Sequence, residues 1–488
     1  MCACEAHTHG ADCSACSPGF GKVDGHCVWQ GVIKNGHFDT KTDWALSGAL
    51  IVGAGWSVFG QDTVCGGGAI SQTVTMPSYA EAGPLVLTYR TRRADSRRAP
   101  PPVGLFLNGV MRPIDTNEWL DWVDHSECLG DAAYGGSLTV AFSRIGPVAD
   151  CNLDPLYIDD VSIDPAAPGQ CAAPGSVRNG DFSEGASGWN PPDQGVSFGA
   201  DGASLHDSPC GAATLSGQIS VPSLPALPHA ALPVAYQLGG TGDSSVDVLL
   251  RLALDGQGLT FLPQRAALGT VNVCLPSWAR GESSSLDARF ASVNGGTCAD
   301  TWNAKLRSLT LVSDPACSDG PLLDGDFEAQ FPLNVQTLSA PPDFVPWQWQ
   351  PYYFTGRPAQ FARDAALAHS GQGYFDVAVD AACQTYGVGQ FSIVPRSSES
   401  GGPALHYWES LVSSSAAHVK VCADHACNTP AAGVGWKQRT LCIDPALTGQ
   451  QIKIALLADS TDNCDTPPAP EHVRFDDLEL TSDASCAK

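Results

Sequence analysis

The pattern of hydrophobic and polar positions predicts short strands along almost the whole chain. Apolar and polar residues alternate with a period of two in six segments, which are 69–74, 156–163, 215–221, 306–312, 388–394 and 473–480. This alternation, with its β-branched residues, is typical of strands with one buried face. The 51 glycines and 36 prolines recur at short intervals and would interrupt long helices. We therefore predict an all-β fold.

The cysteines after residue 60 divide the 488-residue chain into three similar blocks. Each block has four cysteines in nearly the same spacing: Cys65, Cys128, Cys151 and Cys171, then Cys210, Cys274, Cys298 and Cys317, then Cys383, Cys442, Cys464 and Cys486. A period of about 145 to 170 residues is too long for a solenoid repeat, so each block is predicted to be a whole domain. The predicted domains are a cysteine-rich module at 1–27 and three repeats at 28–170, 171–316 and 317–488.

Short motifs recur in the same order within the blocks. An Asn/Asp-Gly-x-Phe turn opens each block, at 35–38, 179–182 and 324–327, and Trp44 and Trp189 follow the first two turns. A strand containing glutamine comes next, and the first block closes on Ile-Asp-Asp-Val. This order resembles carbohydrate-binding-module jelly rolls of the galactose-binding-like type. Over residues 28–488 the resemblance implies three tandem antiparallel β-sandwich (jelly-roll) domains.

The first 27 residues contain five cysteines and almost no apolar residues, so only disulfides would hold this segment together. The run from Cys16 to Cys27 resembles the last loop of an EGF-like or laminin-type module, which implies that these two cysteines pair. The upstream part of such a module is missing, so Cys2 is left without its expected partner.

The 19 cysteines indicate an oxidising compartment, and the chain is expected to be secreted or displayed on a cell surface. The second and third cysteines of a block lie about 23 residues apart, a spacing that suits two neighbouring strands joined by a loop. This spacing predicts the pairs Cys128–Cys151, Cys274–Cys298 and Cys442–Cys464, and Cys422–Cys427 is predicted to close a local hairpin. The first cysteine of each block has two candidate partners: the last cysteine of that block, or the one before its opening turn. The second option leaves Cys486 unpaired.

The resemblance also implies a structural calcium ion between the opening strand and the first aspartate of the closing strand. The matching positions are Asp39 and Asp159 in the first block, and Glu328 and Asp476 in the third. Oxygen ligands of this kind suit calcium. The second block has Ser183, Arg307 and Ser308 at these places, so its site is expected to be lost. The alternative is that these acidic residues are solvated charges at a sheet edge.

An aromatic insertion in the third block is a candidate ligand platform, because sugar rings stack on flat aromatic side chains. Its candidate residues are Trp347, Trp349, Tyr352 and Tyr353. Alternatively, one of the two tryptophans replaces the core tryptophan of the other blocks.

Five arginines between residues 90 and 98 form a basic cluster in a chain of net charge −25: Arg90, Arg92, Arg93, Arg97 and Arg98. The cluster would attract an anionic glycan or an acidic surface of another copy. A solvated hairpin tip is the alternative. The overall acidity disfavours nucleic acid as a partner, and no apolar run approaches the length of a membrane span.

No nucleophile elbow, zinc-protease helix or nucleotide-binding loop is present, so we predict a non-enzymatic protein. The favoured hypothesis is binding of polysaccharide or another surface ligand, with avidity from tandem modules. The second is a structural subunit of an extracellular filament, coat or adhesin stalk that self-associates head to tail, with Cys2 and Cys486 as possible links. A glycan-active hydrolase has no positive support.

Overall fold

The structure is a computed structural model of the full chain. It describes residues 8–9, 15–24, 26–47, 51–52, 55–59, 68–93, 103–114, 120–144, 155–190, 195–199, 202–206, 213–240, 248–262, 269–292, 302–317, 319–322, 324–327, 348–349, 359–379, 385–395, 401–412, 418–424, 426–431, 433–460 and 471–487.

The N-terminal module consists of two small antiparallel hairpins. The first pairs β1 (Thr8–His9) with β2 (Ala15–Cys16), and the second pairs β3 (Phe20–Val23) with β4 (His26–Trp29). A disulfide joins Cys16 to Cys27, which confirms the predicted pair. The ring of Phe20 packs edge-on against Trp29, with 5.2 Å between centroids, and supplies what little apolar packing these hairpins have.

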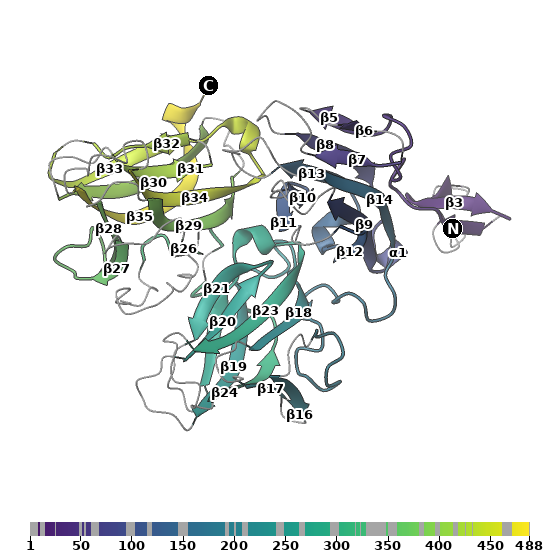
Figure 1. Cartoon of the computed structure of the whole chain (residues 1–488), viewed down its shortest axis with the longest axis horizontal. Helices are drawn as coiled ribbons and strands as arrows, with labels where there is room; N and C mark the ends of the chain where they lie inside the picture. The colour runs from purple at the N-terminus through teal and green to yellow at the C-terminus, as the bar shows by residue number, and fades with distance from the viewer. Residues whose placement is uncertain are drawn as a thin grey trace. The chain divides into compact units, whose positions relative to one another are not determined.

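The rest of the described residues form almost entirely β-structure, and their sheets repeat one topology three times (Figure 1). Each repeat contains one sheet of five strands that we call sheet A. Sheet A1 has the order β11 (Val110–Pro113), β10 (Val103–Leu107), β13 (Ser137–Arg144), β8 (Ala69–Thr75) and β5 (Ala45–Ser47). Sheet A2 has the order β21 (Gln257–Leu262), β20 (Val248–Leu254), β23 (Ser283–Ser292), β18 (Ala213–Ser220) and β15 (Ser176–Val177). Sheet A3 has the order β32 (Ala426–Asn428), β31 (Val419–Ala423), β34 (Gln451–Asp459), β29 (Thr385–Ile393) and β26 (Gln348–Trp349).

The second sheet of each repeat, sheet B, also keeps its strand order. Sheet B1 has the order β12 (Val123–Cys128), β9 (Leu85–Arg93), β14 (Leu156–Pro165), β7 (Ser57–Phe59) and β6 (Ile51–Val52). Sheet B2 has the order β22 (Gly269–Cys274), β19 (Ala230–Gly240), β24 (Trp302–Leu309), β17 (Gly202–His206) and β16 (Val196–Gly199), and β25 (Val312–Ser313) also pairs with β19. Sheet B3 has the order β33 (Gly435–Cys442), β30 (Gly402–Leu411), β35 (Glu471–Asp483), β28 (Gly373–Val379) and β27 (Ala359–Arg363).

Apolar side chains from both sheets share one core in the first and third repeats, which makes each a β-sandwich. In the first repeat, Phe142 of sheet A1 and Tyr89 of sheet B1 are buried in the same cluster. In the third, Ile454 of sheet A3 and Phe475 of sheet B3 are fully buried together. The alternating burial along these strands is the period-two pattern that the sequence predicted.

Helices are limited to single turns in the described residues. They are α1 (Tyr79–Ala82) and the 3-10 turns η1 (Asp131–Ala133), η2 (Ser277–Ala279), η4 (Pro445–Leu447) and η6 (Ala484–Cys486). Across the described part of the chain no helix is long and apolar enough to cross a membrane.

The disulfides correct the predicted pairing within the repeats. The second cysteine of each block pairs with the fourth, in Cys128–Cys171, Cys274–Cys317 and Cys442–Cys486, across 43, 43 and 44 residues. The predicted pairs Cys128–Cys151, Cys274–Cys298 and Cys442–Cys464 are therefore wrong, because the chain after the closing strand returns to the end of β12, β22 or β33. The local pair Cys422–Cys427 is confirmed.

Cys486 is consequently neither unpaired nor exposed, since it is bonded to Cys442 and 5% accessible. The suggested link between copies through Cys486 is wrong. Cys2, Cys65, Cys151, Cys210, Cys298, Cys383 and Cys464 lie outside the described residues.

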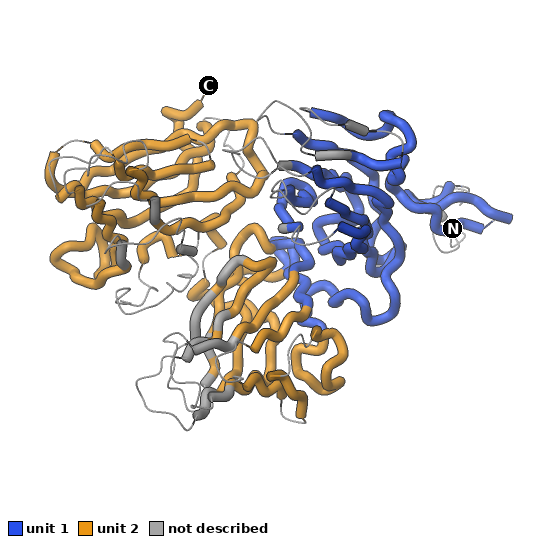
Figure 2. Tube along the Cα trace, in the orientation of Figure 1, with its two compact units in different colours: residues 1–178, 218–226, 280–284 blue, residues 179–217, 227–279, 285–488 orange. Residues whose placement is uncertain are grey.

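The chain forms two compact units, coloured separately in Figure 2. Unit 1 comprises residues 1–178 with two short segments of the second repeat, 218–226 and 280–284. Unit 2 comprises residues 179–217, 227–279 and 285–488.

Within unit 1, the first repeat holds the segment 280–284 through a buried ion pair. Arg112 Nη2 lies 2.8 Å from Glu282 Oε2, and Arg112 Nη1 donates to Ser284 Oγ at 3.1 Å. The two charged side chains are only 2% and 8% exposed. Asp131 accepts hydrogen bonds from the backbone and hydroxyl of Ser223, which ties down the other segment.

Candidate functional site

The Asn-Gly-x-Phe turn is a structural element at the start of each repeat. In the first repeat, Asn35 and Phe38 both adopt left-handed backbone conformations, with φ of 52° and 51°. The amide of Asn35 donates to the carbonyls of Thr40 and Thr42, and the indole of Trp44 donates to the carbonyl of Asn35 at 3.1 Å. The second repeat forms the same contacts with Asn179 and Trp189.

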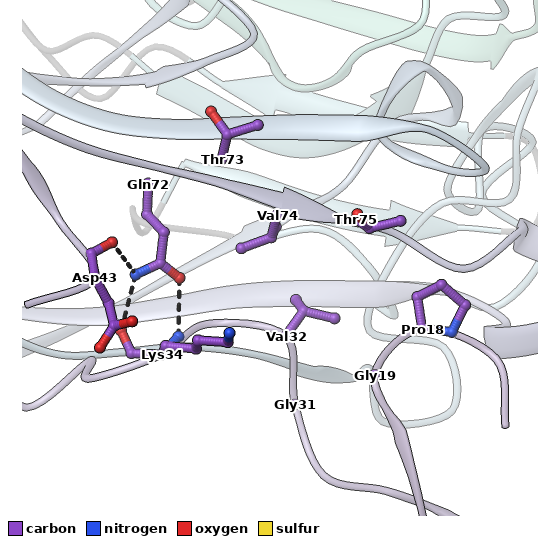
Figure 3. Close-up of a pocket in the computed structure, with 10 residues that line it drawn as sticks. All are labelled: Pro18, Gly19, Gly31, Val32, Lys34, Asp43, Gln72, Thr73, Val74 and Thr75. Atoms are coloured by element: carbon purple, nitrogen blue, oxygen red, sulfur yellow. Dashed lines mark hydrogen bonds between the residues drawn. The ribbon is translucent and has the colours of Figure 1, made fainter.

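The glutamine of the following strand also has a structural role. Gln72 on β8 accepts from the backbone of Lys34 at 2.8 Å and donates to the carbonyls of Lys34 and Asp43. These contacts, drawn in Figure 3, hold the opening turn against sheet A1. They border a largely polar groove of about 460 Å³ between the β3–β4 hairpin and β8, lined by Pro18, Gly19, Gly31, Val32, Lys34, Asp43, Gln72, Thr73, Val74 and Thr75.

The two consecutive aspartates of the closing strand mark a bulge. The pairing of β14 with β9 shifts register between Asp159 and Ser162, and Asp160 has φ of 53°. Asp477 on β35 has φ of 48° at the corresponding place in the third repeat. A bulge redirects side chains that a regular strand would place on alternate faces, and in the first repeat it brings Asp159 and Asp160 beside His37 of the opening turn.

In the first repeat the bulge gathers three possible metal ligands, one from the opening turn. They are His37, Asp159 and Asp160, whose ligand atoms lie within 4.8 Å of one another. The predicted partner Asp39 is exposed and is not a member of this group. His37 Nδ1 contacts Asp160 Oδ1, and Arg90 Nη1 lies 3.2 Å from Asp160 Oδ2.

The surroundings of the two carboxyl groups shift their pKa values in opposite directions. Burial raises the pKa of Asp159. Burial acts in the same direction on Asp160, but hydrogen bonds from His37 and Arg90 outweigh it and lower the pKa of that carboxyl. A nitrogen ligand and a neighbouring guanidinium do not suit calcium, which prefers six to eight oxygen ligands. The group therefore fits calcium poorly.

In the third repeat the corresponding carboxylates are occupied by protein donors. Asp476 is fully buried and accepts from the backbone N–H groups of His369 and Ser370, at 2.8 and 3.1 Å, and from Asp477. Asp477 accepts from the Ser370 hydroxyl at 2.7 Å and contacts His369 Nδ1 at 2.6 Å. Burial raises the pKa of Asp476 to about 6.

Through His369 and Ser370, these hydrogen bonds attach the loop 364–372 to Asp476 and Asp477 of β35, and we call this set of contacts the latch. Each of the four carboxylate oxygens has a donor or a histidine nitrogen beside it, so these residues do not fit a calcium ion. Glu328, the other predicted ligand, lies outside the described residues.

The outer face of sheet B1, which points away from the core, carries a row of aromatic and basic side chains. The guanidinium of Arg92 lies 5.1 Å from the ring centroids of both Trp122 and Tyr157. The ring of Trp56 packs edge-on against Tyr157, with 5.1 Å between centroids. Arg90 lies 5.7 Å from the centroid of Trp122. The side chains of Trp56, Trp122, Tyr157 and Arg92 are all partly exposed, and we call this surface the B1 face.

The outer face of sheet B3 carries a second aromatic group, which we call the B3 face. The imidazole of His369 stacks on Trp408, with 3.7 Å between centroids and 15° between planes. Trp436 meets the same imidazole edge-on at 5.7 Å. Arg474 lies 5.5 Å from the ring centroid of Tyr374.

Strand register relates the two faces position by position. Trp122 precedes Val123, which pairs with Thr91, so Trp122 lies beside Arg92. Trp436 pairs with Ser410, which occupies the position of Arg92 in sheet B3. Both faces thus present a tryptophan from the edge strand at the same place, although their basic residues differ.

Most of the predicted ligand residues do not belong to the B1 or B3 face as the structure describes them. Trp347, Tyr352 and Tyr353 lie outside the described residues, and Trp349 is described only as part of β26. Sequence reasoning missed the two faces, because only strand pairing brings their tryptophans beside residues that are distant in the sequence, such as Arg92 and Tyr157.

The predicted arginine cluster is divided by the alternation of β9. Arg90 and Arg92 point to the B1 face, whereas Arg93 is 7% exposed and lies on the other side, so it does not belong to a surface patch. Arg97 and Arg98 lie outside the described residues. Arg90 is paired with Asp124 at 2.9 Å as well as with Asp160.

Comparison with known proteins gives a likeness in fold only. No family model matches the chain, and no curated protein matches it. Solved structures that are similar include TmCBM61 in complex with β-1,4-galactotriose, at 15% identity over 34% of this chain and 100% of that chain, with a TM-score of 0.23. Another is the tandem CBM22-1–CBM22-2 of Xyn10C from Paenibacillus barcinonensis, at 13% identity over 57% of this chain and 94% of that chain, with a TM-score of 0.20.

An apo cyclase from Fischerella sp. is also similar, at 13% identity over 34% of this chain and 95% of that chain, with a TM-score of 0.22. At these scores the likeness carries no argument about ligand or activity. The function is therefore argued from the geometry of the chain itself.

Proposed function

We propose that this chain is a non-catalytic extracellular protein that binds polysaccharide through the B1 and B3 faces. The observation that carries the proposal is the pair of partly exposed aromatic groups at matching positions on two sheets of the same topology. Tryptophan and tyrosine rings on a sheet face offer flat apolar surfaces for the C–H groups of sugar rings. A polar side chain beside them, such as that of Arg92, would bond the hydroxyl groups.

Two further observations support the non-catalytic and extracellular parts of the proposal. On the B3 face, polar groups beside the rings are engaged in holding the fold, as in the contacts among His369, Ser370 and Asp477. The five disulfides of the described residues suit an oxidising compartment.

The proposal is tested by affinity electrophoresis of the full chain in native gels that contain a soluble polysaccharide. A panel of galactan, xylan, dextran and polygalacturonate covers neutral and acidic sugars. We expect at least one polysaccharide to retard the protein. Trp122→Ala should weaken retardation by a ligand of the B1 face, and Trp408→Ala should weaken retardation by a ligand of the B3 face, each by about 10-fold, the effect of losing about 1.4 kcal/mol of stacking.

Val28→Ala is the matched control, because Val28 is an apolar residue that is 47% exposed and belongs to the β3–β4 hairpin, not to sheet B1 or B3. It should leave mobility unchanged. Equal retardation of the wild type and both tryptophan variants, or no retardation in any gel, would contradict the proposal.

A further inference from the structure

Arg92 projects from the B1 face because of its place on β9. Its neighbours Thr91 and Arg93 are 0% and 7% exposed, so both point towards the interior. Alternation along the strand then directs Arg92 to the outer face. There its guanidinium lies between Trp122 and Tyr157, 5.1 Å from each ring centroid.

Arg92 differs in its partners from Arg90, which is two residues earlier on the same face. Arg90 is held by two carboxylates, those of Asp124 and Asp160. Among the described residues, no carboxylate forms an ion pair with Arg92; its Nε is buried, so its two Nη groups are the ones that could donate to a ligand. One arginine of this face is thus neutralised within the protein, and the other keeps its charge and its donors.

A guanidinium set between aromatic rings suits an anionic sugar. Its planar fork can donate two parallel hydrogen bonds to a carboxylate or to a sulfate. The rings on either side would carry the apolar face of the sugar that bears this group. At physiological ionic strength, charges further than about 8 Å away are largely screened, so the acidic character of the whole chain has little effect on this contact.

The B3 face lacks this arrangement. Ser410 stands at the position of Arg92, and Arg474, which replaces Tyr157, lies opposite Asp376 in the strand pairing. Asp477 also borders the aromatic group of this face. An anionic sugar is therefore expected at the B1 face and not at the B3 face.

We propose that the B1 face binds an anionic polysaccharide, in which a carboxylate or sulfate group pairs with Arg92 while its sugar ring stacks on Trp122 or Tyr157. This inference rests on the proposed function and deepens it by naming the class of ligand.

The test uses the full chain in native gels containing polygalacturonate, dextran sulfate or uncharged dextran, at low and high salt. The expected result is retardation by polygalacturonate, dextran sulfate or both, weakened by salt, with none by dextran. The gel that retards the protein identifies a carboxylate or a sulfate as the recognised group. Arg92→Gln should weaken binding at least 10-fold, and Arg92→Lys, which keeps the charge without the fork, should lie in between.

Arg363→Gln is the matched control, because it removes the same charge from an exposed residue of β27. Thermal unfolding checks that every variant is folded. Equal binding by Arg92→Gln and Arg363→Gln would overturn the inference. Binding of a neutral polysaccharide alone, sensitive to Trp122→Ala, would also overturn it while leaving the proposed function intact, whereas no retardation in any gel would overturn both.

Discussion

At the residue scale, the opening turn shows why its short motif recurs. The backbone of the closing strand passes directly against the glycine, since Val161 N donates to the carbonyl of Gly36 at 3.0 Å and Leu478 N to that of Gly325 at 2.8 Å. A Cβ atom built at Gly36 would lie 1.9 Å from the carbonyl oxygen of Val161, and one at Gly325 would lie 2.1 Å from that of Leu478. Glycine is required because backbone, which cannot move aside cheaply, fills the space.

Gly36→Ala should therefore destabilise the first repeat by about 3 kcal/mol, because the added methyl group forces the turn away from β14. Gly136→Ala is the control, since a Cβ there meets nothing within 4 Å and should change the free energy of unfolding little. Urea unfolding followed by tryptophan fluorescence measures both. An unfolding midpoint for Gly36→Ala equal to that of Gly136→Ala would contradict this account of the turn.

At the scale of elements, β34 places a charged residue in an unusual setting. Lys453 lies between Ile452 and Ile454, which are 3% and 0% exposed, and it pairs across the sheet with Phe391. Its ammonium group is 5.8 Å from the Phe391 ring centroid. Burial lowers the pKa of Lys453 to about 8, because removing the charged form from water is costly.

The sign of the pH dependence follows from this lowered pKa. In the unfolded chain the lysine pKa is about 10.4, so between about pH 8 and 10.4 the unfolded state binds more protons than the folded state. The contribution of Lys453 to the free energy of unfolding should therefore rise with pH through that range. Lys453→Met should remove the rise and stabilise the protein at pH 7 by about 1–3 kcal/mol.

Chemical unfolding at pH 7, 9 and 10 measures this effect, with Lys41→Met at an exposed position as the control. A wild-type profile parallel to that of Lys453→Met would show that burial does not perturb this lysine.

At the scale of the whole molecule, the contacts within unit 1 attach parts of the second repeat to the first. The ion pair of Arg112 and Glu282 joins residues 170 positions apart and is almost completely buried. A backbone hydrogen bond lies beside this pair, because Ala132 N donates to the carbonyl of Gly281 at 2.9 Å. Buried charges are tolerated when they are paired, and removing one partner leaves the other without compensation.

Arg112→Ala should cost about 3–5 kcal/mol, because it removes the guanidinium that compensates the buried carboxylate of Glu282. The double variant Arg112→Met with Glu282→Leu should recover most of this loss by replacing the pair with apolar side chains. Differential scanning calorimetry measures both, and Arg363→Ala is the exposed control. Equal losses in the single and double variants would show that the pair itself is not what holds the segment.

Local patterns in the sequence were sufficient for the features that depend on nearby residues. Strand periodicity predicted the all-β fold, because each residue's burial depends on the pleat of its own strand. The hairpin disulfides Cys16–Cys27 and Cys422–Cys427 were predicted correctly, since their cysteines are only 11 and 5 residues apart.

Only the tertiary structure decided which distant residues meet. Spacing favoured Cys128–Cys151, but the path of the chain after β14 brings Cys171 to Cys128 instead. The B1 face likewise brings together Arg92 of β9, Tyr157 of β14 and Trp122, which precedes β12, and no sequence interval predicts that these residues meet. It follows from the order β12-β9-β14 and from the register of those strands, which the packing of the whole sandwich determines.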